Sequence, residues 1–257
     1  MKILALEFSS SQRSVAIVSA SGGEALRRPP EVSEIRVPKS EIGQRLAEIA
    51  LPLPVLGVTS AVSVCEVVET GRGKTMQPLG MVEEALRQAG LEREQIECLA
   101  VGLGPGSYTG IRAAIALAQG WQLARDVKLI GVSSAECVAA QAQADGCLGP
   151  VSVVIDAQRG EFYLATYKIN APSRREVEPL RLASLADVKA RADAGDTLIG
   201  PAIHDWFPGG RVVFPRAAML GRLALERTAS VLGEKLQPLY LREITFVKAS
   251  PPRTVGL

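Results

Sequence analysis

Apolar positions along the chain follow two alternating spacings. Short apolar or alternating runs predict strands over 2–8, 14–19, 61–69, 96–103, 126–132, 151–157, 161–167, 197–199 and 212–214. Recurrence every three to four residues predicts helices over 76–89, 111–124, 185–194 and 217–232, and one that begins at Ser134 or Ala135. Strands separated by helices in this way pair in parallel through right-handed crossovers. The pattern therefore predicts an α/β fold, with the strand over 61–69 at a sheet edge.

Two segments share one pattern, and they divide the chain into two related halves. Residues 3–18 (ILALEFSSSQRSVAIV) and 151–167 (VSVVIDAQRGEFYLATY) each hold an apolar strand that ends in an acid, a short turn and a second strand. The stretch 145–150 (DGCLGP) predicts a boundary between domains 1–147 and 148–257. The polar, proline-rich stretch 21–54 is predicted to be an insertion with a short helix over 39–50, and the tail from Lys248 to be loose.

A glycine turn stands between the strand over 96–103 and the helix over 111–124. It reads Gly-Leu-Gly-Pro-Gly over 102–106, and Ser107 follows as a candidate helix N-cap. A capped helix after such a turn can hold an anion on backbone N–H groups, so Gly104, Gly106 and Ser107 are candidate phosphate-binding residues. No lysine follows at a useful position, although Arg112 could assist. The same turn also allows a helix to lie close to its neighbours.

Two acids, Glu7 and Asp156, end the first strand of each repeated hairpin. In two-lobed phosphotransferases such acids hold a metal–phosphate pair, which would make this chain an active ATP-dependent phosphotransferase. The other interpretation is that each carboxylate only accepts hydrogen bonds from the N–H groups of its own turn. The sequence leaves both interpretations open, so Glu7 and Asp156 remain candidate cofactor-binding residues.

The helix over 111–124 carries small residues on nearly every face, among them Ala113, Ala116 and Gly120. Such a helix can be buried on its own sheet. It can also form, together with the amphipathic helix over 76–89, a flat surface for another subunit. The two uses are compatible because one face of the helix can pack on the sheet while another face contacts the other subunit.

Composition excludes several classes of protein. The formal net charge of +2 argues against a dominant polyanion-binding role. His204, the single histidine, lies in a polar loop and no G-x-S-x-G motif is present, which argues against a Ser-His-Asp peptidase and against the usual His/Cys metal site. The GKT at 73–75 lacks the earlier glycine of a P-loop, because Val68 stands at that position.

Cysteine spacing and hydropathy indicate the compartment. The four cysteines show no CxxC spacing, and Cys65 and Cys98, which lie in apolar runs, are expected to be reduced and buried. No apolar run reaches the length of a membrane span, and Glu7 interrupts the apolar opening, which is therefore interpreted as a strand and not as a secretory signal. We expect a cytoplasmic protein without membrane contact.

The chain resembles the TsaB (YeaZ) family through the motif GPGSYTGIR over 104–112 and the following AQG over 118–120. Further similar stretches are ILALE at 3–7, DAQRGEFY at 156–163 and PLYLR at 238–242. Residues 21–54 depart from the family pattern, and Phe8 stands where a threonine is common. The resemblance implies the actin-like ATPase (ASKHA) fold: two ribonuclease H-like α/β lobes, the second smaller or degenerate.

The resemblance also implies a function. TsaB proteins are non-catalytic paralogues of TsaD in the bacterial machinery that makes threonylcarbamoyladenosine on tRNA. TsaD binds a metal through two histidines four residues apart, and the matching positions here are Ser134 and Val138. Neither residue can replace a histidine ligand. The resemblance therefore implies an accessory subunit with no catalytic residue, metal or cofactor of its own.

The implied partner is a TsaD-like subunit, in a heterodimer that a TsaE-like ATPase joins. Alone, the chain is expected to form a homodimer through the same surface. ATP or ADP is expected at the subunit junction, and tRNA is expected to be reached only through the complex. By the family pattern, the partner surface comprises Met76, Leu79, Gly80, Glu83, Arg87, Arg112, Ala113, Ala116 and Gly120.

Overall fold

The structure is a computed structural model, and it describes residues 1–20, 62–71, 77–227 and 229–241. The predicted insertion over 21–54 with its helix, Met76 and the tail from Lys248 lie outside the described residues. None of the described helices is long and apolar enough to cross a bilayer.

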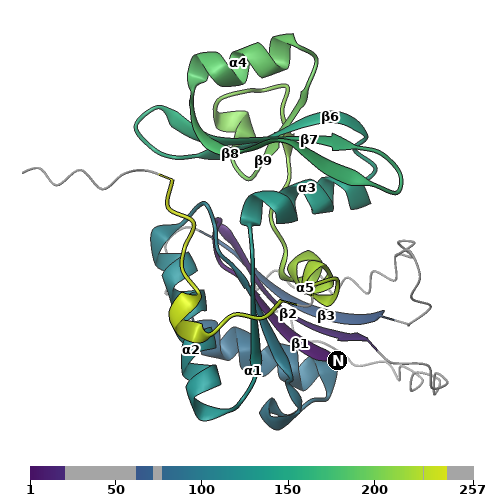
Figure 1. Cartoon of the computed structure of the whole chain (residues 1–257), viewed down its shortest axis with the longest axis vertical. Helices are drawn as coiled ribbons and strands as arrows, with labels where there is room; N and C mark the ends of the chain where they lie inside the picture. Colours follow the sequence, from purple (N-terminus) through teal and green to yellow (C-terminus); the bar gives the residue numbers. More distant parts are fainter. Residues whose placement is uncertain (21–61, 72–76, 228, 242–257) are drawn as a thin grey trace, which may run out of the picture.

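Two five-stranded sheets carry the fold (Figure 1). The first, sheet A, has the order β3-β2-β1-β4-β5 and is built from β1 (Lys2–Glu7), β2 (Gln12–Ala20), β3 (Val62–Thr70), β4 (Cys98–Gly102) and β5 (Lys128–Val132). The second, sheet B, has the order β10-β9-β6-β7-β8 and is built from β6 (Gly149–Asp156), β7 (Glu161–Ile169), β8 (Arg174–Ser184), β9 (Thr197–Gly200) and β10 (Arg211–Val212).

If the strands of each sheet are numbered 1 to 5 in the order in which they occur along the chain, both sheets have the strand order 3-2-1-4-5. In both sheets the first three strands pair antiparallel and the last two join in parallel. The predicted internal repeat is therefore confirmed, as are the parallel pair β4–β5 and the edge position of β3.

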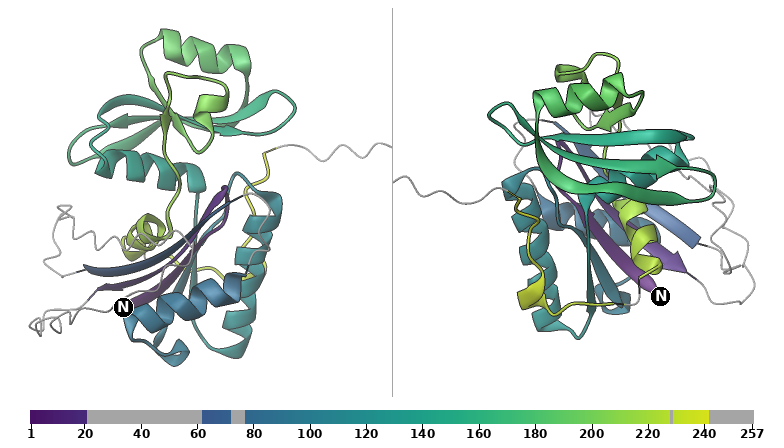
Figure 2. Two further views of the ribbon diagram at one scale, coloured as in Figure 1. Left: turned by 180° about the vertical axis from the view of Figure 1, so that it is seen from behind. Right: turned by 45° about the horizontal axis from the view of Figure 1, so that its top comes forward.

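Helices separate and cover the sheets (Figures 1 and 2). They are α1 (Pro78–Ala89), α2 (Tyr108–Ala124), α3 (Ser134–Ala144), α4 (Leu185–Asp193) and α5 (Ala217–Leu225), with 3-10 turns η1 (Arg93–Gln95), η2 (Ile203–Asp205) and η3 (Gly233–Lys235). Helices α1 and α2 pack on one face of sheet A, and α3 and α5 on the other. Helix α3 also packs on sheet B, whose far face is covered by α4.

The structure differs from the sequence-based prediction at two elements. Strand β8 was not predicted, because this edge strand mixes charged residues with a proline and its register with β7 is irregular. Helix α5 ends at Leu225 and not at 232. There the Arg227 guanidinium donates to the Gly131 carbonyl and to Glu136, which directs the chain away from the helix axis.

Residues 229–241, the C-terminal strap, return to sheet A. Val231 forms an isolated antiparallel bridge with Leu129 of β5, and the backbone of Gly233 bonds the side chains of Gln119 and Gln122 on α2. Leu236 is buried in the core beneath α2. Helix α5 and the C-terminal strap thus pack on sheet A, although both belong by sequence to the range 148–257.

Candidate partner interface and glycine turn

The glycine turn joins β4 to α2 as the sequence predicted. The strand ends at Gly102 and the helix begins at Tyr108. Ser107 is the N-cap, and its Oγ accepts a hydrogen bond from the N–H of Gly110 at 3.3 Å. This satisfies one of the free donors in the first turn of the helix.

The turn is filled by the chain itself. A Cβ atom on Gly106 would overlap the Ser9 carbonyl oxygen, and one on Gly110 would overlap that of Phe8. The N–H of Ser107 donates to the Ser9 carbonyl at 2.7 Å, and that of Gly104 donates to the Ser134 hydroxyl at 3.2 Å. Two N–H groups of the candidate phosphate cradle are therefore used within the protein, and the glycines accommodate the β1–β2 turn.

Glu7 lies beneath this turn, fully buried. Its Oε1 accepts from the N–H of Ser9 at 2.8 Å, and its Oε2 accepts from the hydroxyl of Ser134 at 3.0 Å. Burial raises the pKa of the Glu7 carboxyl above its ordinary value, and the hydrogen bonds from Ser9 and Ser134 partly oppose this shift. Glu7 thus ties together the β1–β2 turn, the glycine turn and the start of α3.

Asp156, the corresponding acid of sheet B, is only half-buried. Its Oδ1 accepts from the backbone N–H of Gln158 at 2.7 Å, and its Oδ2 accepts from the Gln158 side chain at 2.9 Å. Gln158 and Arg159 have φ values of 66° and 61°, a left-handed conformation that disfavours residues with side chains. Each acid therefore caps its own turn, and the described residues show no hydrogen bond that joins Asp156 to the Glu7 network.

Ser134 and Val138, which the resemblance aligns with the metal ligands of TsaD, are both buried. Ser134 belongs to the Glu7 network, and Val138 packs against sheet B. No group of three or more His, Cys, Asp or Glu residues in the described part of the chain could hold a metal ion. The Nε2 atom of His204 lies 2.6 Å from the Gly210 carbonyl oxygen, which gives the ring a structural role.

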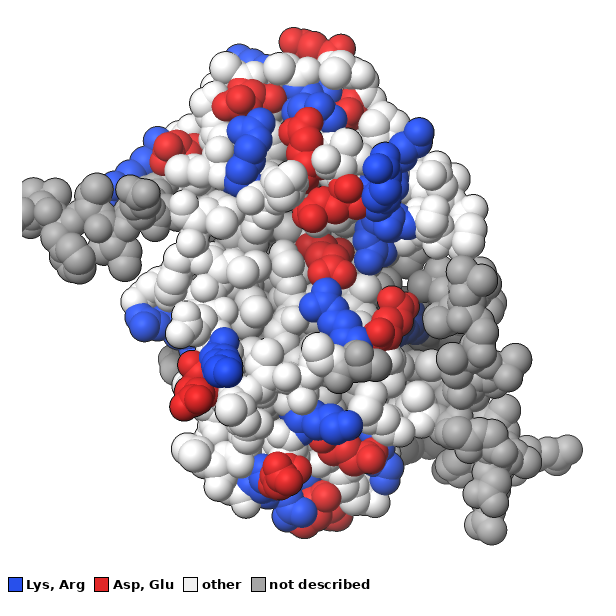
Figure 3. Space-filling view, viewed as in Figure 1, with Lys and Arg blue, Asp and Glu red and all other residues white. Residues whose placement is uncertain are grey.

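The predicted partner residues of α2 lie mostly on one exposed stripe. Arg112, Ala116 and Gly120 are exposed at intervals of four, and Ala113 is half-buried beside them. Ile111, Ala114, Ile115 and Ala118 are buried toward sheet A. The helix therefore buries one face on its own sheet and leaves the other open. The surface over α2 and the C-terminal strap, at the lower left of Figure 3, carries few charged side chains.

Helix α1 contributes exposed residues to the same side of sheet A. Gly80, Glu83 and Arg87 are exposed as the partner surface requires. Leu79, also predicted on the partner surface, is 62% exposed. The buried stripe of the helix is Met81, Val82, Ala85 and Leu86.

Two exposed residues of α2 were missed. Leu123 is 90% exposed and Tyr108 is 58% exposed. The signal was available, because positions 108, 112, 116, 120 and 123 keep one helical spacing. We call the exposed residues Leu79, Gly80, Glu83, Arg87, Tyr108, Arg112, Ala116, Gly120 and Leu123 the helical face.

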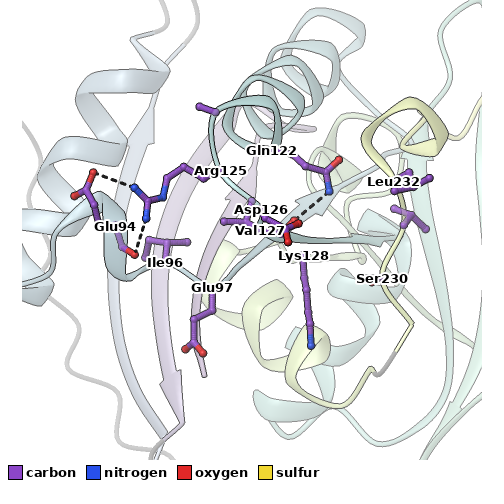
Figure 4. Close-up of a pocket in the computed structure, with 12 residues that line it drawn as sticks. Glu94, Ile96, Glu97, Gln122, Arg125, Asp126, Val127, Lys128, Ser230 and Leu232 are labelled. Carbon is purple, nitrogen blue, oxygen red and sulfur yellow. Dashed lines mark hydrogen bonds and ion pairs between the residues drawn. The ribbon is translucent and has the colours of Figure 1, made fainter.

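A depression of about 770 Å³ opens elsewhere, at the start of β4 and β5 (Figure 4). Three of the side chains around it have partners within the chain: Arg125 pairs with Glu94 at 3.4 Å, and Gln122 donates to the Val127 carbonyl at 3.1 Å. In open α/β sheets ligands bind at the carboxyl ends of parallel strands, and this depression lies at the amino ends. We therefore do not assign it a function.

Several relatives of this chain are named for one pathway. The chain is 29% identical over 197 residues to the tRNA threonylcarbamoyladenosine biosynthesis protein TsaB of Escherichia coli, covering 70% of this chain and 85% of that protein. It is 30% identical over 125 residues to the protein of the same name from Haemophilus influenzae, covering 44% of this chain and about half of the relative (53%).

Solved structures share the fold. YeaZ from Pseudomonas aeruginosa has a TM-score of 0.67 at 21% identity, covering 93% of this chain and 99% of that chain. A crystal structure of a protein with similarity to the peptidase YeaZ, from the same organism, gives 0.66 at 22% identity, with 94% and 99% covered. The actin-like ATPase fold expected from the sequence is thus confirmed.

A family model spans most of the described fold. The model of TsaD, tRNA N6-adenosine threonylcarbamoyltransferase, matches residues 70–247, which is more than half of the chain. This range contains the glycine turn, α1, α2 and α3 and the whole of sheet B. The chain therefore belongs to the TsaD family, and its relatives named above are TsaB proteins.

Proposed function

We propose that this chain is an accessory subunit that binds a TsaD-like catalytic subunit through the helical face and supports threonylcarbamoyl transfer to the adenosine beside the anticodon of tRNA. The observation that carries the proposal is the exposed stripe of α2, where Ala116 and Gly120 leave the helix backbone open to close approach. The names of the TsaB relatives supply the pathway.

A non-catalytic role agrees with the glycine turn. Ser134 stands where a TsaD metal ligand is expected, and its hydroxyl completes a buried network with Glu7 and Gly104. The alternative function, an active phosphotransferase, requires Glu7 to reach a metal-bound phosphate. A fully buried carboxylate that already accepts two hydrogen bonds is poorly placed for this.

The remaining parts of the proposal concern the assembly. We propose that ATP or ADP binds at the subunit junction and that a TsaE-like ATPase joins there. The isolated chain pairs with a second copy through the helical face, and tRNA is reached through the complex in the cytoplasm.

The experiment is a binding titration between the purified chain and the TsaD-like subunit of the same organism, with complex mass measured by light scattering. Ala116→Arg places a long charged side chain in the open stripe and should raise the Kd by about 100-fold or more. The matched control is Ala192→Arg on the exposed side of α4, which should leave the Kd unchanged.

A cellular readout links binding to the pathway. In a strain whose own gene is replaced by the variants, nucleoside mass spectrometry of tRNA should show loss of threonylcarbamoyladenosine for Ala116→Arg and normal levels for Ala192→Arg. Equal modification with both variants, or no complex with the unaltered chain in any nucleotide state, would contradict the proposal.

A further inference from the structure

Arg112 is the single charged residue of α2, and it stands on the exposed stripe. It is four residues before Ala116 and eight before Gly120, so the three share one side of the helix. A partner that approaches the small residues closely enough to contact the helix backbone must also cover Arg112.

The two acids of α1, Glu83 and Glu84, already have basic partners, and Arg112 has no acidic one. Glu83 pairs with Arg93 at 2.7 Å, and Glu84 pairs with Arg87 at 2.6 Å. Arg112 forms no ion pair with any acid in the described part of the chain. It is therefore a charge that the monomer leaves to solvent.

The Arg112 guanidinium is nevertheless held in place. One of its N–H groups donates to the Tyr108 hydroxyl, and its central carbon lies 4.7 Å from the centre of the Tyr108 ring. The Tyr108 ring in turn lies 6.1 Å, centre to centre, from that of Tyr240 on the C-terminal strap. The strap is fixed next to Tyr240 by the N–H of Leu239, which donates to the Leu103 carbonyl at 2.9 Å.

Covering such an arginine imposes a chemical requirement on the partner. A guanidinium removed from water without an acceptor is strongly unfavourable, whereas a carboxylate can accept two of its N–H groups in one plane. Tyr108 satisfies only one of the five donors. Because the side chain is already held, less conformational entropy is lost when a partner binds it.

We propose that Arg112 is the specificity-determining charge of the helical face and that it pairs with a carboxylate of the TsaD-like partner. This inference rests on the proposed function and adds the chemistry of the contact. A second copy of the chain is the less suitable occupant. The carboxylates that α1 would bring to a two-fold pairing, Glu83 and Glu84, are already engaged in ion pairs.

The test compares Arg112→Gln and Arg112→Glu with the unaltered chain in titrations against the TsaD-like subunit at several salt concentrations. The glutamine should raise the Kd by about 30-fold or more, and the glutamate should raise it further. The Kd of the unaltered chain should rise with salt, and that of Arg112→Gln should depend on salt less steeply. The matched control is Arg175→Glu on the exposed strand β8, which should leave the Kd unchanged.

A charge exchange identifies the partner group. Acids on the surface of the TsaD-like subunit are changed to lysine one at a time, and one of these changes should restore binding to Arg112→Glu. Circular dichroism and melting temperature confirm that each variant is folded. If the unaltered chain forms no complex, the proposed function fails and the inference fails with it. If the complex forms and survives Arg112→Glu, only the inference is overturned.

Discussion

The two lobes share a strand order but differ in the element that follows the fourth strand. In sheet A, β4 leads through the glycine turn into α2, a helix of 17 residues. In sheet B, β9 leads into η2, a 3-10 turn of three residues. A repeated framework therefore carries a long helix with one exposed face in one lobe and only a three-residue 3-10 turn at the matching place in the other.

The acids at the ends of the first strands also differ between the lobes, in their burial and in the segments that they join. Glu7 is fully buried and joins three segments, whereas Asp156 caps only its own turn near the surface. The lobe that presents the helical face is thus also the lobe whose turns are tied together beneath it. The hydrogen-bond network around Glu7 thus holds α2 in a fixed position relative to sheet A.

The largest loss of stability is expected when the contact between α2 and the β1–β2 turn is disturbed. Gly110→Ala would press a methyl group onto the Phe8 carbonyl, a backbone atom that cannot move alone. We expect the free energy of unfolding to fall by about 3 kcal/mol. Gly120→Ala is the control in the same helix, because its methyl group meets no atom within 4 Å. It should raise stability by up to about 1 kcal/mol, as urea unfolding would show. Similar free energies of unfolding for the two variants would contradict the close contact between α2 and the β1–β2 turn.

The next effect compares the two acid networks. Ser134→Ala removes the hydroxyl that serves Glu7 and the N–H of Gly104, leaving two buried groups unpaired. We expect a loss of about 2–3 kcal/mol in the free energy of unfolding. Asp156→Ala, at the corresponding turn of sheet B, should cost about 1 kcal/mol or less, because water can replace the lost acceptor. If Asp156→Ala lowered the free energy of unfolding more than Ser134→Ala does, the lobe of sheet B would be the one with the more tightly held turn.

The third effect depends on pH. The folded protein raises the pKa of Glu7 above its ordinary value of 4.5, so between these two pKa values the folded state keeps a proton that the unfolded state releases. The stability gained from this proton is complete below pH 4.5 and is lost as pH rises through the folded pKa. The loss is about 1.4 kcal/mol for each unit between the two values. Urea unfolding of Glu7→Gln at pH values above 4.5 should not show this decline in the free energy of unfolding. The same decline in Glu7→Gln as in the unaltered protein would contradict the assignment to Glu7.

The smallest effect concerns the strained turn of sheet B. Arg159 is exposed and adopts a φ of 61°, which asparagine tolerates better than arginine. Arg159→Asn should raise the melting temperature slightly, by an amount equivalent to about 0.5 kcal/mol. The Kd for the TsaD-like subunit should stay unchanged. A drop in stability would show that the arginine side chain has a structural role in this lobe.

The sequence predicted most of the local structure, since hairpins, the cap at Ser107 and the α1 helix follow from patterns within a few residues. It did not predict what fills the glycine turn, because that depends on residues as far apart as Glu7 and Ser134. Strand β8 was missed because an exposed edge strand lacks the apolar alternation of a buried one.

The position of α3 between the sheets has a consequence for how the protein unfolds. Cys137 and Ala140 belong to the core of sheet A, while Ala135, Val138 and Ala139 belong to that of sheet B. Melting of either core therefore strips apolar contacts from the other. The two halves, although copies of one architecture, form a single cooperative unit, and calorimetry should record one transition with equal calorimetric and van't Hoff enthalpies.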